Sequence, residues 1–179
     1  MTALNRPTLT LELPVAFRLA TYSDLPKLEW YGQYTHFRAL FRRTYQEQLQ
    51  HRRLMLLADC NNFPIGHIFI QFNSSEQQRL SDGRRRAYFY SLRVMEMFQG
   101  KGVGSQLVRE AETLASDHDF SWVTIAAAKD NIRARRLYEK LGYRVFGEDE
   151  GKWNYLDHEN RMRYVHEPCW VLEKRIELR

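Results

Sequence analysis

The residues of this sequence that are best spaced for chemistry lie in the segment QGKGVGSQLV, from Gln99 to Val108. Three of its first six residues are glycine. Glycine inside a helix costs about 1 kcal/mol relative to alanine, so such a cluster before a helical pattern usually serves a backbone shape or a close contact. The backbone N–H groups of Gly100, Gly102, Val103 and Gly104 can converge on an anion, which the positive end of the following helix also favours. The segment therefore predicts a phosphate site.

A strand before the glycines and a helix after them must hold this geometry. The stretch Arg86–Val94 is rich in aromatic residues and predicts a strand, and apolar residues recur at helical spacing between Gly102 and Asp117. The dinucleotide fingerprint needs a glycine where Ser105 stands, and the P-loop needs one where Met95 stands. Neither motif fits, whereas the pattern Gln-x-x-Gly-x-Gly does.

A second segment, NIRARRLYEKLGYRVFGE, contains a helical pattern from Ile132 to Leu141. Asn131 stands where a helix N-cap is expected. Tyr138 shares an apolar helical face with Leu137, which is typical of a core aromatic residue. Gly142 suits a left-handed helix end. Taken alone, these residues are explained by structural roles, without any catalytic or binding function.

Together the two segments resemble the GNAT superfamily of N-acetyltransferases. The first matches the family's pyrophosphate loop for acyl-CoA, and the second matches its Asn-x-x-Ala-x-x-x-Tyr-x-x-x-Gly-aromatic pattern. The matching residues are Gln99, Gly102 and Gly104 in the first segment, and Asn131, Ala134, Tyr138, Gly142 and Tyr143 in the second. The resemblance extends from about Phe17 to the last strand, and its specific motifs lie between Leu92 and Tyr143.

The resemblance implies an α/β (α+β) fold with a mixed, twisted, largely antiparallel sheet flanked by helices. In this family the central strand pair is splayed, so that the pantetheine arm of the cofactor enters between the strands. Acetyl-CoA is then the cosubstrate, and no metal is implied. The implied cofactor-binding residues are Leu92, Val94, Gln99, Gly100, Lys101, Gly102, Val103, Gly104, Ser105 and Asn131.

The resemblance also assigns two catalytic groups. The tyrosine that matches Tyr138 protonates the departing thiolate, and a strand N–H near Val94 polarises the thioester carbonyl. Many family members carry a basic carboxylate on this strand, but here the strand offers Tyr88, Tyr90 and Ser91. The sequence therefore does not assign the general base. Candidates by chemistry alone are Glu29, His67 and Glu148, and a water chain to solvent is an equal alternative.

The implied function is transfer of an acetyl group from acetyl-CoA to a primary amine of a small molecule or a peptide. A non-catalytic sensor of acyl-CoA is an alternative, although it has no need of Tyr138. An acyltransferase that uses another acyl chain or a hydroxyl acceptor is a second alternative. The aromatic residues between Glu29 and Tyr45 predict either an aromatic-walled acceptor pocket or a core stripe.

The rest of the chain predicts one mixed α/β domain over residues 1–179. Further strands are expected over 15–21, 52–60, 64–72 and 122–128, further helices near Leu25–Tyr34 and Phe37–His51, and a polar loop over Asn73–Arg86. The runs YRVFGE and RYVHEPCWVLEKR, separated by the turn LDHEN, predict a closing antiparallel hairpin. Pro168 should mark a bulge or an unpaired edge, because proline has no N–H for the ladder.

Composition limits the partners. The 27 lysines and arginines against 22 acidic residues give a net charge of +5, which suits an anionic ligand. Arg84–Arg86 lie in a polar stretch without interleaved aromatics, so nucleic acid is not expected. No apolar run suits a signal peptide or a membrane span, and Cys60 and Cys169 form no disulfide or metal framework, even with His166. A cytoplasmic protein is expected, as a monomer or a homodimer.

Overall fold

The computed structural model describes residues 11–73 and 80–178. The N-terminal residues 1–10, where no signal peptide is expected, lie outside this part. The predicted loop Asn73–Arg86 is described only at its two ends, because residues 74–79 also lie outside it. No helix in the described residues is long and apolar enough to cross a membrane.

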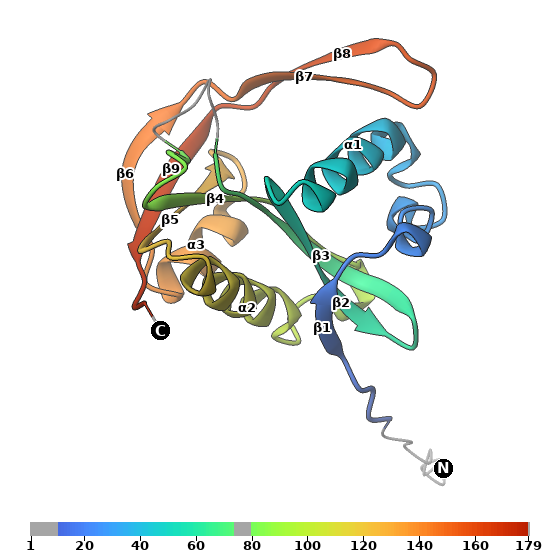
Figure 1. Cartoon of the computed structure of the whole chain (residues 1–179), viewed down its shortest axis with the longest axis horizontal. Helices are drawn as coiled ribbons and strands as arrows, with labels where there is room; N and C mark the ends of the chain where they lie inside the picture. Colours follow the sequence, from blue (N-terminus) through green and yellow to red (C-terminus); the bar gives the residue numbers. More distant parts are fainter. Residues whose placement is uncertain (1–10, 74–79, 179) are drawn as a thin grey trace, which may run out of the picture.

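A seven-stranded twisted sheet forms the centre of the molecule (Figure 1). Its strands in spatial order are β1 (Ala16–Leu19), β2 (Arg53–Cys60), β3 (Phe63–Gln71), β4 (Arg86–Val94), β5 (Trp122–Ala128), β9 (Cys169–Arg175) and β6 (Arg144–Asp149). The β4–β5 pair is parallel, and the other neighbouring pairs are antiparallel. The expected mixed, largely antiparallel sheet is therefore confirmed.

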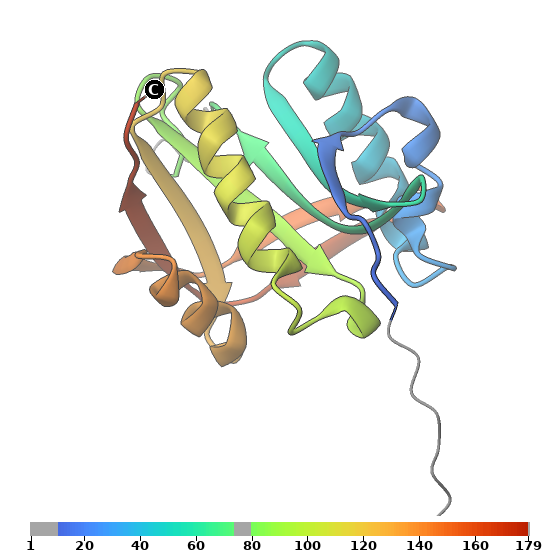
Figure 2. The ribbon, with the colours of Figure 1, turned by 90° about the horizontal axis from the view of Figure 1, so that it is seen from below.

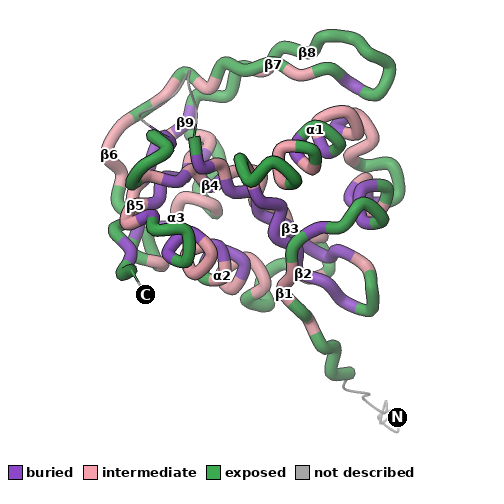
Figure 3. Tube along the Cα trace, viewed as in Figure 1, coloured by how far each residue is buried: buried purple, intermediate pink, exposed green. Residues whose placement is uncertain are grey.

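Helices cover both faces of this sheet. The helices α2 (Val103–Asp117) and α3 (Ile132–Lys140) lie on one face, and α1 (Arg38–Leu49) lies on the other (Figure 2). Each begins and ends close to its predicted range. The larger apolar core lies under α2 and α3, and a smaller one lies under α1. Figure 3 shows that the central strands are largely buried.

The expected helix over Leu25–Tyr34 is wrong. The segment instead contains the short 3-10 turns η1 (Tyr22–Asp24), η2 (Lys27–Glu29) and η3 (Thr35–Phe37). Trp30 and Tyr31 have φ angles of 42° and 57°, and such left-handed backbone cannot continue a right-handed helix. The Trp30 side chain is 3% exposed and its indole N–H donates to the Pro64 carbonyl at 2.8 Å. This long-range contact outweighs the local helical pattern.

The expected closing hairpin is correct only in part. Strands β6 and β9 do pair, but a second hairpin of β7 (Lys152–Leu156) and β8 (Met162–His166) separates them. The turn LDHEN lies at the tip of this hairpin, where Asp157 accepts the N–H groups of Glu159 and Arg161. Pro168 lies between β8 and β9, outside both ladders, as expected for a residue without an N–H.

A buried ion-pair network ties the N-terminal turns to the sheet. The Arg18 guanidinium of β1 contacts Asp24 at 2.7 and 2.9 Å and also bonds Asp59 of β2. Asp24 is 1% exposed, and its carboxylate accepts the backbone N–H of Thr21 at 2.8 Å. Burial alone raises the pKa of Asp24, but the bonds from Arg18 and Thr21 outweigh it and lower the pKa to about 2. The network therefore holds the turns against β1 and β2.

Replacing this carboxylate should cost stability in a pH-dependent way. Asp24→Asn should lower the free energy of unfolding by about 1–3 kcal/mol near neutral pH, because charged hydrogen bonds are lost. The folded pKa of about 2 lies below the unfolded value of about 3.9, so this stabilisation is present above the unfolded pKa and is lost as the pH falls through the folded one. In urea unfolding, the difference between the parent and Asp24→Asn should therefore shrink from about pH 5 to about pH 2.

The matched control is Glu139→Gln, which removes a carboxylate from an exposed ion pair with Arg135. Its effect should stay within about 0.5 kcal/mol. A difference for Asp24→Asn that stays constant down to about pH 2 would show that the Asp24 charge does not stabilise the turns.

Candidate functional site

The central parallel strands β4 and β5 are paired at only one end. Their ladder runs from Arg86↔Trp122 to Phe89↔Ile125 and then stops. Strand β4 nevertheless continues against β3 to Val94, and β5 continues against β9 to Ala128. Figure 2 shows the two strands diverging toward their carboxyl ends. The splayed strand pair is therefore present, and we call the unpaired stretch between the carboxyl-terminal ends of β4 and β5 the opening.

A β-bulge shapes the β4 side of this opening. Phe69 of β3 pairs with Tyr90 and His67 pairs with Arg93, so two β4 residues face the single residue between Phe69 and His67. Ser91, inside the bulge, has a φ angle of 56°. A bulge bends the strand and turns its following residues. It therefore directs the last residues of β4 away from β5 and sets their orientation.

The N–H of Val94 points into the opening. The next N–H, of Met95, donates to the Ile65 carbonyl of β3 at 2.9 Å. Because bonding alternates along an antiparallel pair, the backbone groups of Val94 must point away from β3. Its carbonyl does so, since it accepts the side-chain amide of Gln99 at 2.9 Å. The geometry thus supports a role for the Val94 N–H in polarising a carbonyl inside the opening.

The glycine loop, between the 3-10 turn η4 (Glu96–Phe98) and α2, presents a row of unused donors. The N–H groups of residues 100–105 have no hydrogen-bond acceptor among the described residues. Gly100 and Gly102 have φ angles of 73° and 88°, and a Cβ atom at either position would meet nothing within 4 Å. Exposed N–H groups before a helix of 15 residues are well suited to an anion. Lys101 is exposed in the same loop, so these residues fit a pyrophosphate.

Gln99 and Asn131 have structural roles that can be seen directly. The Gln99 side chain links the end of β4 to α3, because its oxygen accepts the Arg133 guanidinium at 2.7 Å. Asn131 caps α3, with its side-chain oxygen accepting the Ala134 N–H at 3.0 Å. These bonds position the loop and the helix. Direct contact of either side chain with a cofactor stays a prediction.

Tyr138 of α3 is a buried residue whose hydroxyl is a candidate proton donor. It is 4% exposed, and its hydroxyl has no hydrogen-bond partner among the described residues. Burial raises the pKa of Tyr138 above its usual range, so the phenol stays protonated near neutral pH. The neighbouring Tyr143, whose ring lies 6.1 Å away, instead donates its hydroxyl hydrogen to Glu112. Tyr138 can therefore act as an acid and is unsuited to act as a base.

None of the three candidate bases is free at the opening. Glu29 is bound by Arg38 at 2.6 Å and by the Thr35 hydroxyl at 2.8 Å. His67 is fully buried with neither ring nitrogen hydrogen-bonded, and burial lowers its pKa well below the usual value. Glu148 is paired with Lys129. The geometry therefore gives none of them a clear path to an amine proton.

An aromatic cluster covers the α1 side of the opening. It is centred on Phe37, and we call it the Phe37 cluster; its members are Tyr34, His36, Phe37, Trp153 and Tyr155. The core-stripe interpretation of the 29–45 segment holds for Phe37 and Phe41, which are both buried, whereas an acceptor pocket stays a prediction. Sequence reasoning missed Trp153 and Tyr155 because it did not separate β7. Their alternation in KWNYL was the available signal.

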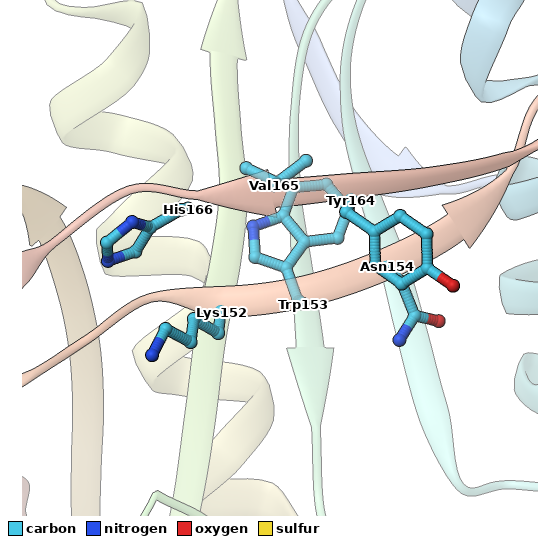
Figure 4. Close-up of a pocket in the computed structure, with 6 residues that line it drawn as sticks. All are labelled: Lys152, Trp153, Asn154, Tyr164, Val165 and His166. Carbon is cyan, nitrogen blue, oxygen red and sulfur yellow. The ribbon is translucent and has the colours of Figure 1, made fainter.

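The cluster adjoins a hollow on the β7–β8 hairpin. The hollow has a volume of about 350 Å³ and is lined by Lys152, Trp153, Asn154, Tyr164, Val165 and His166 (Figure 4). Trp153 belongs to both, because its ring also stacks with Phe37 at 6.3 Å. The hollow lies on the hairpin, whereas the donors described above lie in the opening between β4 and β5. The hollow thus meets the Phe37 cluster through Trp153.

Comparison with known proteins agrees with this geometry. A model of the acetyltransferase (GNAT) family matches residues 19–143. NAA60 of Arabidopsis thaliana, solved with acetyl-CoA, is 19% identical with a TM-score of 0.67, over 91% of this chain and 99% of that one. The ribosomal-protein-S18-alanine N-acetyltransferase of Escherichia coli is 15% identical with a TM-score of 0.67, over 93% and 96%. A GNAT acetyltransferase of Streptococcus pneumoniae is 16% identical with a TM-score of 0.64, over 92% and 100%.

A charge placed in the glycine loop should abolish the binding of CoA. Gly102→Glu should weaken CoA affinity at least tenfold more than Gly102→Gln, because only the first places a negative charge beside the pyrophosphate. Both variants share the same left-handed strain, since Gly102 has a φ angle of 88°. Titration calorimetry with CoA measures the affinities, and circular dichroism checks that both variants fold. Equal affinities for the two variants would show that this loop does not hold the anion.

Proposed function

Because the chain belongs to the acetyltransferase (GNAT) family, we propose that it transfers the acetyl group of acetyl-CoA to a primary amine of a small molecule or a peptide. The observation that carries this proposal is the opening between β4 and β5. Unused N–H groups for an anion lie beyond one end of β4, the Val94 N–H points into the opening, and the unbonded phenol of Tyr138 lies on α3, which packs against β5. These are the groups that acyl transfer from a thioester requires.

In the proposed transfer, a few groups of this chain have separate roles. Acetyl-CoA supplies an activated carbonyl carbon and a thiolate leaving group. The amine nitrogen forms a bond to this carbon, the carbon–sulfur bond breaks, one proton leaves the amine, and one proton reaches the sulfur. The Val94 N–H donates to the carbonyl oxygen as negative charge develops there. Tyr138 supplies the proton for the sulfur, and residues 100–105 hold the pyrophosphate.

We infer that the amine proton passes to solvent. This inference is supported by the engagement of Glu29 with Arg38 and by the complete burial of His67. A neutral amine is a good nucleophile toward a thioester, so positioning it against the carbonyl supplies much of the rate. The buried, unpaired thiols of Cys60 and Cys169 fit our further proposal that the enzyme acts in the reducing cytoplasm.

The proposed activity is tested by following the release of free thiol from acetyl-CoA. The protein should release thiol in the presence of at least one amine from a panel of polyamines, aminoglycosides, amino acids and peptides, and mass spectrometry should find the acetylated amine. Acetyl-CoA at about a thousand times its dissociation constant should also stabilise the fold by about 4 kcal/mol. Thermal stabilisation without turnover of any amine would instead identify a sensor of acyl-CoA.

Removal of the Tyr138 hydroxyl should slow the reaction. Tyr138→Phe keeps the buried ring and should lower kcat by about a hundredfold to ten-thousandfold if protonation of the thiolate limits the rate. Because burial raises the pKa of Tyr138, the parent should not lose this acid below about pH 10, and the fall should be uniform across the neutral range.

The matched control is Tyr143→Phe, which removes a nearby buried hydroxyl that is already bonded to Glu112. It should lower the melting temperature slightly and leave the pH profile of turnover unchanged. Equal turnover for the parent and Tyr138→Phe at every pH would make Tyr138 a packing residue only.

A further inference from the structure

Arg93, near the end of β4, is a partly buried cation without a carboxylate partner. Its guanidinium lies 4.9 Å from the ring centroids of both Tyr34 and Phe37, and it donates to the Ser91 hydroxyl. Arg93 makes no ion pair within the described residues, and Glu167 only attracts its charge from further away. Burial lowers the pKa of Arg93, but a guanidinium stays charged at any physiological pH. A desolvated cation of this kind favours an anionic partner.

The place of Arg93 is on the acceptor side of the proposed reaction. It immediately precedes Val94, whose N–H points into the opening, and it pairs with His67 of β3. Its side chain extends over the face that α1 and the Phe37 cluster cover, opposite the face of α2 and the glycine loop. An anion bound by Arg93 would therefore lie next to Val94 and on the face opposite the glycine loop.

Three carboxylates near this side are already engaged, whereas Glu167 attracts the charge of Arg93 from further away and makes no ion pair within the described residues. Glu29 binds Arg38, Glu47 binds Arg53, and Asp157 binds Arg163. A polyamine would therefore bring a second ammonium group toward Arg93 with none of these carboxylates free to receive it. A carboxylate on the acceptor, in contrast, would find an unpaired guanidinium. The guanidinium of Arg93, which has no ion-pair partner within the described residues, thus favours an acceptor that carries an anion.

The Phe37 cluster offers an apolar wall beside this cation. The Phe37 ring lies 4.2 Å from His36 and 4.9 Å from Tyr155, as measured between ring centroids. Trp153, which is 38% exposed, continues the wall into the hollow on the hairpin. Flat aromatic surfaces of this kind bind planar or apolar side chains with little loss of conformational entropy.

From these observations we propose that the acceptor is a primary amine with a carboxylate and an apolar, preferably aromatic, side chain, of which an aromatic α-amino acid is the simplest example. Arg93 binds the carboxylate, and the Phe37 cluster packs against the side chain. This assignment rests on the proposed N-acetyltransferase function. The product is the N-acetylamino acid, formed with release of CoA thiol, and the ammonium proton passes to solvent.

The geometry of the guanidinium explains the expected selectivity. The planar guanidinium can donate two parallel hydrogen bonds to one carboxylate. A free amino acid has such a carboxylate beside its amine, and a peptide N-terminus has an amide there instead. A hydrogen bond to a charged group changes affinity by about tenfold to a hundredfold. The kcat/KM for a free amino acid should therefore exceed that for its own amide by a factor in this range.

Three acceptors with the same ring test this assignment: L-phenylalanine, L-phenylalaninamide and 2-phenylethylamine. For the parent protein, kcat/KM for L-phenylalanine should exceed that for the other two by about tenfold to a hundredfold. The amide has the more easily deprotonated amine, so intrinsic reactivity opposes the expected order. A parent that prefers the amide or a peptide N-terminus would overturn the assignment.

Variants of Arg93 locate the source of the preference. Arg93→Gln should reduce the ratio of kcat/KM for L-phenylalanine over its amide to about one, and Arg93→Lys, which keeps the charge without the planar guanidinium, should restore part of it. Lys140→Gln removes an equal charge from the exposed end of α3, away from the Phe37 cluster, and should keep the parent's ratio. An unchanged ratio in Arg93→Gln would show that Arg93 does not bind the carboxylate of the acceptor.

A binding measurement separates this assignment from the proposed activity. In titration calorimetry of L-phenylalanine into CoA-saturated protein, Arg93→Gln should weaken binding by about tenfold or more, while melting temperatures check that the variants fold. Carboxylate-dependent binding without turnover would leave the assignment of the site standing and contradict only the enzymatic function. Turnover of amines with equal binding by the parent and Arg93→Gln would contradict only the assignment.

Discussion

The structure depends on one constraint, which is that β4 and β5 are each held by an outer neighbour after they stop pairing with each other. The β3–β4 ladder continues to Val94 and the β5–β9 ladder continues to Ala128, so neither strand can close the opening without breaking an intact ladder. Backbone groups that face such an opening need partners. The fold thus builds a site for an extended ligand from main-chain geometry, and the bulge at Ser91 and the glycine loop complete it.

The two faces of the sheet divide the chemistry of the site. The α2 face carries the unbonded N–H groups of residues 100–105, which suit an anion. The α1 face carries the Phe37 cluster and the cation of Arg93. In the proposed mechanism, the Val94 N–H and the Tyr138 phenol lie between them, so the reacting groups would meet inside the opening. A cofactor and an acceptor can therefore approach from opposite faces and compete little for the same contacts.

Local patterns predicted the parts of this arrangement that are stabilised locally. The glycine loop, α2 and α3 follow from helical spacing and from the N-cap at Asn131, which the structure confirms. The splay followed from the family resemblance alone, because no periodicity encodes where two strands stop pairing. The turns before α1 were mispredicted because the distant contact of Trp30 with Pro64 sets their backbone. The pairing of β8 with β7 was missed because the run Lys152–Leu156 was not recognised as a strand, although the interruption at Pro168 was expected. Arg93 was missed because its aromatic neighbours come from another element.

The acceptor side of the site is assembled from turns and a hairpin, and carboxylates are used there to hold the elements in place. Asp24 ties the N-terminal turns to Arg18, Glu29 ties η2 to α1 through Arg38, and Asp157 closes the hairpin turn with Arg163. A carboxylate that is locked by a guanidinium has a low pKa and a fixed position, so it makes a poor proton acceptor for a bound amine. Because these acids hold elements in place, none of them is available as a general base. In the proposed assignment, Arg93 and not one of these acids meets the acceptor, so a cation and an aromatic surface would set selectivity on this side.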